Sequence, residues 1–286
     1  MWVLFAFGSA LFAGITAILA KIGIKNTDSN LATAIRTVVI MFFSWLMVFI
    51  VGSHTTINDI DARTLIFLVL SGLATGASWL FYFKAMQLGD VNKVTPIDKS
   101  STVLTMILAV IFFSEAVTLY KVIGAIAIAI GTYLMIEKKK VESSAPVYGK
   151  WLIYAILSAV FASLTAILGK VGIQGIESNL GTAIRTIVVL MMAWLVVFVT
   201  RKQDQLKHID IKSWLFIILS GFATGGSWLF YYRALQDGPA SVVVPIDKLS
   251  IVITVAFSYF ILKEKLTLKA LIGLVLITAG TLMLLL

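Results

Sequence analysis

The sequence is an internal duplication of a largely apolar segment. Residues from Trp2 to about Ile136 align without a gap with residues from Trp151 to about Leu285, at a constant offset of 149 positions. The matching stretches include ITAILAK and LTAILGK, SNLATAIRT and SNLGTAIRT, and TPIDKSS and VPIDKLS. Because similar sequences fold alike, we expect two structural repeats, residues 1–137 and 150–286, joined by a linker at residues 138–149.

The composition indicates that this duplication lies in a membrane. Hydrophobic residues make up 60% of the chain and charged residues 13%, and the mean hydropathy is +1.01. Soluble domains of this length are far less apolar. The chain has no cysteine, which excludes disulfides and thiolate metal sites.

Each repeat contains five apolar segments, and about 20 apolar residues suffice to cross the hydrocarbon core. We therefore predict an all-α membrane protein with ten transmembrane helices, arranged as two inverted five-helix repeats. The expected spans are residues 2–24, 30–51, 63–86, 93–113 and 119–136, then 151–173, 179–200, 212–235, 242–262 and 268–286.

The charges of the connecting loops support the inversion and predict the orientation. Most Lys and Arg residues fall on one predicted face, and the other face carries Arg63, Lys121, Lys170 and Arg233. Cytoplasmic loops are enriched in Lys and Arg, so we expect both termini to be extracytoplasmic. Equivalent loops have opposite bias: GSHTTINDIDAR is poor in cations, whereas its counterpart RKQDQLKHIDIK is rich in them.

Hydroxyl side chains follow helical spacing along the third span of each repeat. Polar groups in a bilayer need partners, so such stripes mark faces turned toward the bundle or a water-filled cavity. Hydroxyls also hold helices together without forming a pathway, and that alternative stays open for any single residue. The stripe residues assigned to a substrate pathway are Thr75, Ser78 and Tyr82 with their equivalents Thr224, Ser227 and Tyr231.

Ionisable residues lie one to two turns inside the second and fourth spans of each repeat. A central charge costs about 2.5–3.5 kcal/mol on insertion scales, so these residues need partners or water. Each Asp can pair with the Arg of a neighbouring helix or with the Lys that follows it. Because adjacent residues on a helix do not face each other, we favour the Asp–Arg pair. Either these pairs open and close in turn as gates, or they are permanent staples. The residues are Arg36, Asp98 and Lys99, and their equivalents Arg185, Asp247 and Lys248.

Other features have structural and functional readings side by side. Pro96 and Pro245 precede the aspartates at an expected helix start, where the helix dipole favours a carboxylate. Trp79 and Trp228 lie mid-span and either line the pathway or pack in the core. We read Glu115 and Glu264 as turn and capping residues, Thr118 and Thr267 as N-caps, and the paired glycines as close-packing positions.

The pattern resembles the EamA-like repeats of the drug/metabolite transporter superfamily. Each half has a Pro-Ile near the fourth span, a Glu in the next turn, and the pattern E-x-x-T-x-x-x-x-x-G leading into the fifth span. The matching residues are Pro96, Glu115, Thr118 and Gly124, then Pro245, Glu264, Thr267 and Gly273. The resemblance covers almost the whole chain and implies a ten-helix inverted-repeat transporter with a central cavity lined by spans 1–4 and 6–9. Family members commonly export amino acids, other metabolites or drugs. Two features depart from the family pattern. The Asp-Lys after Pro-Ile replaces the apolar run that is usual there, and both termini are expected outside, whereas ten-span exporters of the family are usually drawn with both inside.

The sequence thus predicts a secondary transporter in the cytoplasmic (inner) membrane of a prokaryote. We expect export of amino-acid-like or other small polar or amphipathic compounds by alternating access, with proton coupling left open. An uncoupled facilitator and a flippase for a lipid-linked substrate are the alternatives. No Walker A motif, H-E-x-x-H motif or nucleophile elbow is present, so we expect no catalytic residues, no metal and no cofactor. The expected partners are a small-molecule substrate and membrane lipids, without nucleic acid, in a monomer or weak homodimer.

Overall fold

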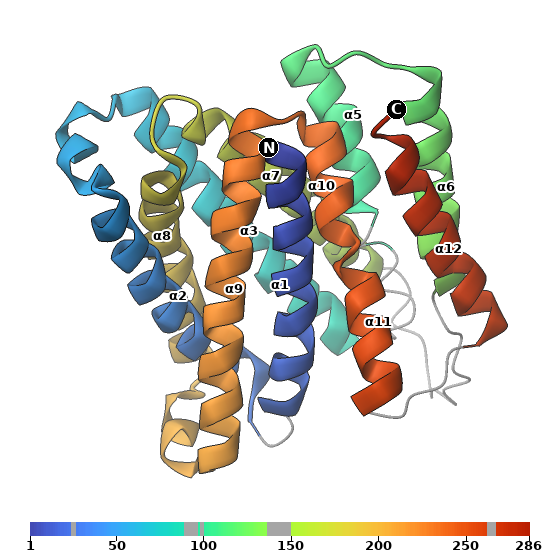
Figure 1. The fold of residues 1–286 in the computed structure, drawn as a ribbon. Helices are drawn as coiled ribbons and strands as arrows, with labels where there is room; N and C mark the ends of the chain where they lie inside the picture. The colour runs from blue at the N-terminus through green and yellow to red at the C-terminus, as the bar shows by residue number, and fades with distance from the viewer. Residues whose placement is uncertain (24–26, 89–96, 98–99, 136–149, 262–266) are drawn as a thin grey trace.

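The computed structural model of the protein describes residues 1–23, 27–88, 97, 100–135, 150–261 and 267–286. Within these ranges the chain is helical and contains no strand. The helices lie side by side, and both termini lie at the same end of the bundle (Figure 1).

The helices reproduce most of the predicted spans to within three residues. Within the described ranges, seven segments are long and apolar enough to cross a membrane, and one of them, Ala240–Phe257, contains two successive helices. Three more helices, Ser101–Phe113, Leu119–Leu134 and Leu268–Met283, are apolar but shorter. The elements are α1 (Trp2–Gly23), α2 (Ser29–Val51), η1 (Ser53–Asp59), α3 (Ala62–Leu88), α5 (Ser101–Phe113), α6 (Leu119–Met135), α7 (Lys150–Ile173), α8 (Ser178–Val199), η2 (Gln203–His208), α9 (Ile211–Asp237), α10 (Ala240–Lys248), α11 (Ser250–Ile261) and α12 (Leu268–Met283).

Helices at equivalent positions of the two halves begin with equivalent side-chain caps. An N-cap oxygen accepts hydrogen bonds from backbone N–H groups that have no partner within the helix. Asp61 accepts from Thr64 N at 2.8 Å, and its equivalent Asp210 accepts from Ser213 N at 2.9 Å. The three pairs of caps are Asp28 and Glu177 for α2 and α8, Asp61 and Asp210 for α3 and α9, and Thr118 and Thr267 for α6 and α12. The expectation for the two threonines is confirmed.

The main helix contacts are the same when the two halves are exchanged. α1 packs mainly on α9 as α7 packs on α3, α2 packs on α9 as α8 packs on α3, and α6 packs on its own equivalent, α12. The predicted close approach at glycines is confirmed where α6 meets α12. A Cβ atom added to Gly124 would lie 2.7 Å from the carbonyl oxygen of Gly280, and one added to Gly131 would lie 2.6 Å from that of Gly273.

The span predicted at residues 242–262 is divided into two helices, α10 and α11, that meet at Leu249, although Ala240–Phe257 as a whole is long and apolar enough to cross a membrane. Pro245 lies inside α10 and does not begin it. The helix begins at Ala240 because a carboxylate from the other half, Glu115, accepts hydrogen bonds from its first N–H groups. Asp247 therefore lies in the last turn of α10, where the helix dipole disfavours a carboxylate, and the dipole does not explain its presence.

Candidate functional site

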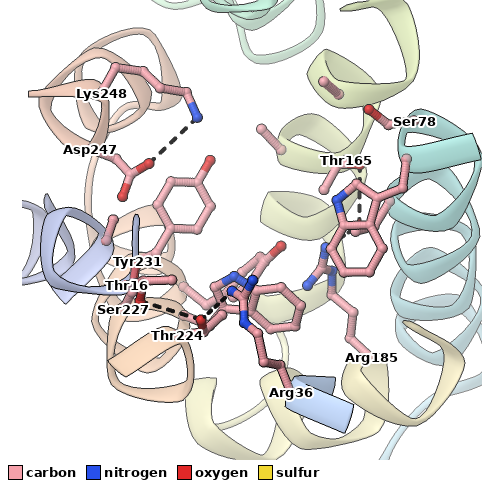
Figure 2. Close-up of a pocket in the computed structure, with 17 residues that line it drawn as sticks. Thr16, Arg36, Ser78, Thr165, Arg185, Thr224, Ser227, Tyr231, Asp247 and Lys248 are labelled. Atoms are coloured by element: carbon pink, nitrogen blue, oxygen red, sulfur yellow. Dashed lines mark hydrogen bonds and ion pairs between the residues drawn. The ribbon is translucent and has the colours of Figure 1, made fainter. Parts of the chain in front are cut away.

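Two adjoining cavities of about 360 and 440 Å³ lie at the centre of the bundle. They share several lining residues, including Arg36, Trp79, Trp228 and Lys248, and so form one space with two compartments. The walls come from α1, α2, α3, α5, α7, α8, α9 and α10 (Figure 2). Helices from both halves therefore enclose the same space.

Twelve of the fourteen residues assigned to a pathway from the sequence line this space. Asp98 and Lys99 lie outside the described residues. Sequence reasoning missed Thr16, Thr165 and Tyr232, although both threonines lie in the repeated stretches ITAILAK and LTAILGK. The twelve are Arg36, Thr75, Ser78, Trp79, Tyr82, Arg185, Thr224, Ser227, Trp228, Tyr231, Asp247 and Lys248.

Arg36 on α2 reaches across to α9. Its Nη2 donates to Thr224 Oγ1 at 2.7 Å, and Thr224 Oγ1 lies 3.3 Å from Thr16 Oγ1 on α1 (Figure 2). Thr224 also donates to the carbonyl of Ser220, one turn earlier. The hydroxyl is thereby oriented with its lone pair toward the guanidinium, so this arginine is held by neutral groups.

Arg185 on α8 makes the equivalent contacts with the other half. Its Nη2 donates to Thr75 Oγ1 at 2.5 Å, and Thr75 Oγ1 lies 3.3 Å from Thr165 Oγ1. We call Arg36–Thr224–Thr16 and Arg185–Thr75–Thr165 the first and second triads. Their members are equivalent by the duplication, residue for residue.

The second triad has contacts that the first lacks. Arg185 Nε donates to Ser71 Oγ at 2.8 Å, and its guanidinium lies 5.3 Å from the Trp228 ring and 4.6 Å from the Tyr232 ring. Arg185 is 1% exposed. Arg36 Nε is buried without a hydrogen-bond partner, because Ser220, the equivalent of Ser71, donates instead to Ile217 of its own helix at 2.7 Å.

The favoured pairing of Asp247 with Arg185 is wrong, and the alternative pairing with Lys248 is the one observed. Asp247 Oδ1 accepts from Ser9 Oγ at 2.6 Å, and Oδ2 lies 3.6 Å from Lys248 Nζ (Figure 2). These two side chains belong to adjacent residues in the last turn of α10. Arg185 is instead surrounded by hydroxyls and aromatic faces, and its Nη1 has no hydrogen-bond partner. Sequence reasoning did not consider such groups as partners for a buried cation.

A second charged cluster lies at the end of the bundle that holds the termini. The Glu115 carboxylate accepts from Ala240 N at 2.7 Å, from Ser241 N at 3.1 Å and from the Ser241 hydroxyl. Lys170 Nζ lies 3.7 Å from Glu115 Oε1, donates to the Gly238 carbonyl, and lies 5.2 Å from the Phe113 ring. We call these residues the end cluster.

The end cluster confirms Glu115 as a capping residue, and the helix that it caps belongs to the other half. Lys170, assigned from the sequence to the cation-poor face, is buried. Glu264, the equivalent of Glu115, lies outside the described residues. The cluster joins the turn after α5, α7 and the start of α10, and so ties the two halves together at this end.

The site offers hydrogen-bond donors and aromatic surface more than it offers metal ligands. Among the described residues, no three His, Asp or Glu side chains come together. The described acidic residue lining the space is Asp247, which already has two partners. The central space is thus lined mainly by hydrogen-bonding and aromatic side chains.

Comparison with known proteins agrees with this fold. Residues 1–137 and 149–286 each match the EamA-like transporter family. A Sinorhizobium protein described as an uncharacterized transporter is 46% identical over 134 residues, which are 47% of this chain and 95% of that protein. A Bacillus subtilis protein, the uncharacterized transporter YxxF, is 26% identical over 222 residues, covering 74% of this chain and 68% of YxxF.

A solved crystal structure shares the fold, with a TM-score of 0.79 at 15% sequence identity, over 99% of this chain and 96% of the other. Because the family match extends over both halves, it accounts for nearly the whole sequence. The chain belongs to the EamA-like transporter family.

Proposed function

We propose that the protein is a secondary carrier that moves a small metabolite across the membrane by alternating access. In this proposal the chain crosses the membrane ten times, as two inverted five-helix repeats, residues 1–137 and 150–286. The seven long and three shorter apolar helices support ten crossings. The inversion is supported by α2, which runs toward the end that holds both termini, whereas its equivalent α8 runs away from it (Figure 1).

The observation that carries the proposal is the difference between the two triads. Inverted repeats generate two states when the same contacts are made by one copy or the other. Here Arg185 is bonded to Ser71, stacked and buried, while Arg36 has a free Nε and is partly exposed. In the opposite state, Arg36 bonds Ser220 and Arg185 releases Ser71.

In this conformation the space extends toward the end of the bundle opposite the termini, where the cation-rich loop that contains Lys202 lies. The larger compartment is lined by Thr33, Tyr82 and Ser101, near the ends of their helices. Asp28, which caps α2 at this end, lies 3.9 Å from Lys202. Lys and Arg mark the cytoplasmic side, so we place the termini outside and describe this state as inward-open. The end cluster closes the other side.

We place the carrier in the inner membrane of a prokaryote, as a monomer or weak homodimer, without enzymatic activity. Export coupled to protons and uncoupled facilitation remain the two modes of the proposal, and Asp247 is the described carboxylate available for coupling. An Asp247→Asn variant that keeps both flux and its pH dependence contradicts coupling through this residue.

The alternative of a lipid flippase lacks a comparable observation. An apolar groove of about 770 Å³ lies along α1 and α9, lined by Phe5, Phe12, Phe222 and Phe230 among others. It shares no lining residue with the central cavities in the described part of the chain. We therefore assign the groove to contact with membrane lipids.

The test is flux into proteoliposomes that contain the full-length protein. A mixed pool of amino acids and small metabolites is offered with and without an imposed pH gradient. Accumulation of one class against its own gradient supports a coupled carrier, and equilibration without accumulation supports a facilitator. Folded protein that moves no small molecule but moves a labelled long-chain lipid supports the flippase and contradicts the proposal.

A further inference from the structure

The central space has an excess of positive charge. Its described lining residues include the cations Arg36, Arg185 and Lys248 and the carboxylate of Asp247. Asp247 lies 3.6 Å from Lys248 and those two charges offset each other. The two arginines remain, and their hydrogen-bond partners, Thr224 for one and Ser71 and Thr75 for the other, are neutral.

A buried cation without a counter-charge is costly in a low-dielectric interior, and the cost falls when an anion enters. We propose that the substrate is a small organic carboxylate with an apolar body, bound in this conformation by the guanidinium of Arg36. This inference rests on the proposed transport function and names the substrate class of the same site.

Arg36 is the arginine placed to bind the carboxylate here. It lines both compartments and is partly exposed, whereas Arg185 is 1% exposed. A guanidinium has five N–H donors in a planar fork that matches a carboxylate. The described contacts of Arg36 use one, in the bond from Nη2 to Thr224, and that bond fixes the plane of the fork.

Aromatic side chains supply the surface for the body of the substrate. Trp79 and Trp228 line both compartments, Tyr231 lines the smaller one and Tyr82 the larger one. Cavities of 300 Å³ or more hold small organic molecules, so about 360 and 440 Å³ are sufficient for a compact acid.

The contacts of Asp247 disfavour a substrate that carries an ammonium group, whether an amine or a zwitterion. A substrate ammonium group needs an acceptor with negative charge, and Asp247 is the described candidate in the lining. Its two oxygens are already engaged, one by the Ser9 hydroxyl and one by Lys248. An acid without an ammonium group therefore fits better than the corresponding amino acid.

The experiment compares head groups on a common body with the full-length protein. Phenylacetate, phenylacetamide, phenethylamine and phenylalanine are offered separately, as are the same four head groups on an isobutyl body. Binding is measured by calorimetry on purified protein, and flux is measured in proteoliposomes. Chloride alone serves as the inorganic anion control.

Three variants assign the head-group contact. We expect Arg36→Gln to weaken carboxylate binding by about 30-fold or more, because it removes a charge-assisted contact. Arg36→Lys keeps the charge without the fork and is expected to lose less. Arg233→Gln is the matched control, since Arg233 is exposed, pairs with Asp237 and lines neither central compartment. If Arg36→Gln does not fold, Arg36→Lys and Thr224→Val carry the test, since both keep a cation at position 36.

The outcomes test the substrate class and the transport function separately. Carboxylate binding that is weakened in the position 36 variants and unchanged in Arg233→Gln supports the inference. Transport of an amine, amide or zwitterion without carboxylate binding overturns the inference and leaves the carrier function standing. Carboxylate binding without flux supports the site and contradicts transport. Binding of carboxylates by Arg36→Gln with unchanged affinity overturns the role of Arg36, and neither binding nor flux of any compound overturns both proposals.

Discussion

Arg36 and Arg185 lie in the same nine-residue motif, SNLATAIRT or SNLGTAIRT, but in different surroundings. Each donates to a threonine of the opposite half. Arg185 also donates to Ser71 and lies over two aromatic rings, whereas Arg36 Nε has no partner. The duplication thus supplies one set of contacts twice, and in this structure the second copy makes more of them than the first.

Two sequence differences between the halves favour the additional contacts of Arg185. Tyr232, which lies over Arg185, is equivalent to Phe83 in the first half. Gly169 is equivalent to Ala20, and a Cβ atom at position 169 would lie 2.8 Å from Tyr232 Cε1 and 3.1 Å from Ser71 Oγ. The glycine therefore leaves room for Tyr232 and Ser71, which contact Arg185.

The largest expected effect comes from breaking the end cluster with Lys170→Met. Removing one partner of a buried ion pair costs about 3–5 kcal/mol, and here the cost falls on the closed end. Because the chain has no cysteine, an introduced Ala13→Cys, which lines the cavity, reports access without interference. We expect an impermeant thiol reagent applied from the side of the termini to label this cysteine much faster in the Lys170→Met background.

The control for this prediction is Arg63→Gln, which removes an exposed cation in the first turn of α3. We expect it to leave the labelling rate unchanged. Equal labelling rates in the Lys170→Met and parent backgrounds show that the end cluster does not close the path.

A smaller effect is expected from Ser71→Ala, which removes the bond that distinguishes the two triads. The lost contact joins a hydroxyl to a buried guanidinium, and such hydrogen bonds contribute about 1.5–3 kcal/mol. The equivalent change, Ser220→Ala, removes a bond from a hydroxyl to its own helix, which contributes little. We expect Ser71→Ala alone to increase labelling of Ala13→Cys from the side of the termini. If the two variants are labelled at the same rate, the bond from Arg185 to Ser71 does not stabilise this conformation.

Gly169→Ala gives the second half the residue that the first half has at the equivalent position, Ala20. The added methyl group crowds Tyr232 and Ser71, and overpacking of this kind costs about 1–3 kcal/mol. We expect the same direction of change in labelling as for Ser71→Ala, measured in the same background. The double variant is then less than additive, since both changes disturb the contacts of Arg185. Full additivity contradicts a shared cause.

The sequence was sufficient for features that depend on local pattern. The α2 helix, expected at residues 30–51, spans Ser29–Val51, because hydropathy and a capping residue determine where an apolar helix begins and ends. The hydroxyl stripes were assigned to the cavity because helical spacing puts them on one face.

The sequence was insufficient where partners come from distant segments. Nothing in the neighbourhood of Pro245 reveals that Glu115 caps α10, since that contact depends on how the halves pack. For the same reason Arg185 was paired with Asp247 on charge alone, although hydroxyls and aromatic rings lie closer to it. The motif around each arginine is nearly the same in both halves, so the motif alone could not reveal that the contacts of the two triads differ.

The smallest expected effect comes from a place where the two halves are alike, the caps Asp61 and Asp210. Both accept a hydrogen bond from the backbone three residues later, so Asp61→Ala and Asp210→Ala are expected to lower the melting temperature in detergent by similar small amounts. Hydrogen bonds from the Thr64 side chain and then its N–H lower the pKa of the exposed Asp61 carboxyl. A lowered pKa contributes stability above the unfolded value and loses it as pH falls through the folded value. The difference between the parent and Asp61→Ala is therefore expected to persist at neutral pH and to shrink below about pH 4. A difference that grows on acidification contradicts this sign, and clearly unequal effects of the two variants at neutral pH show that the halves differ even at their caps.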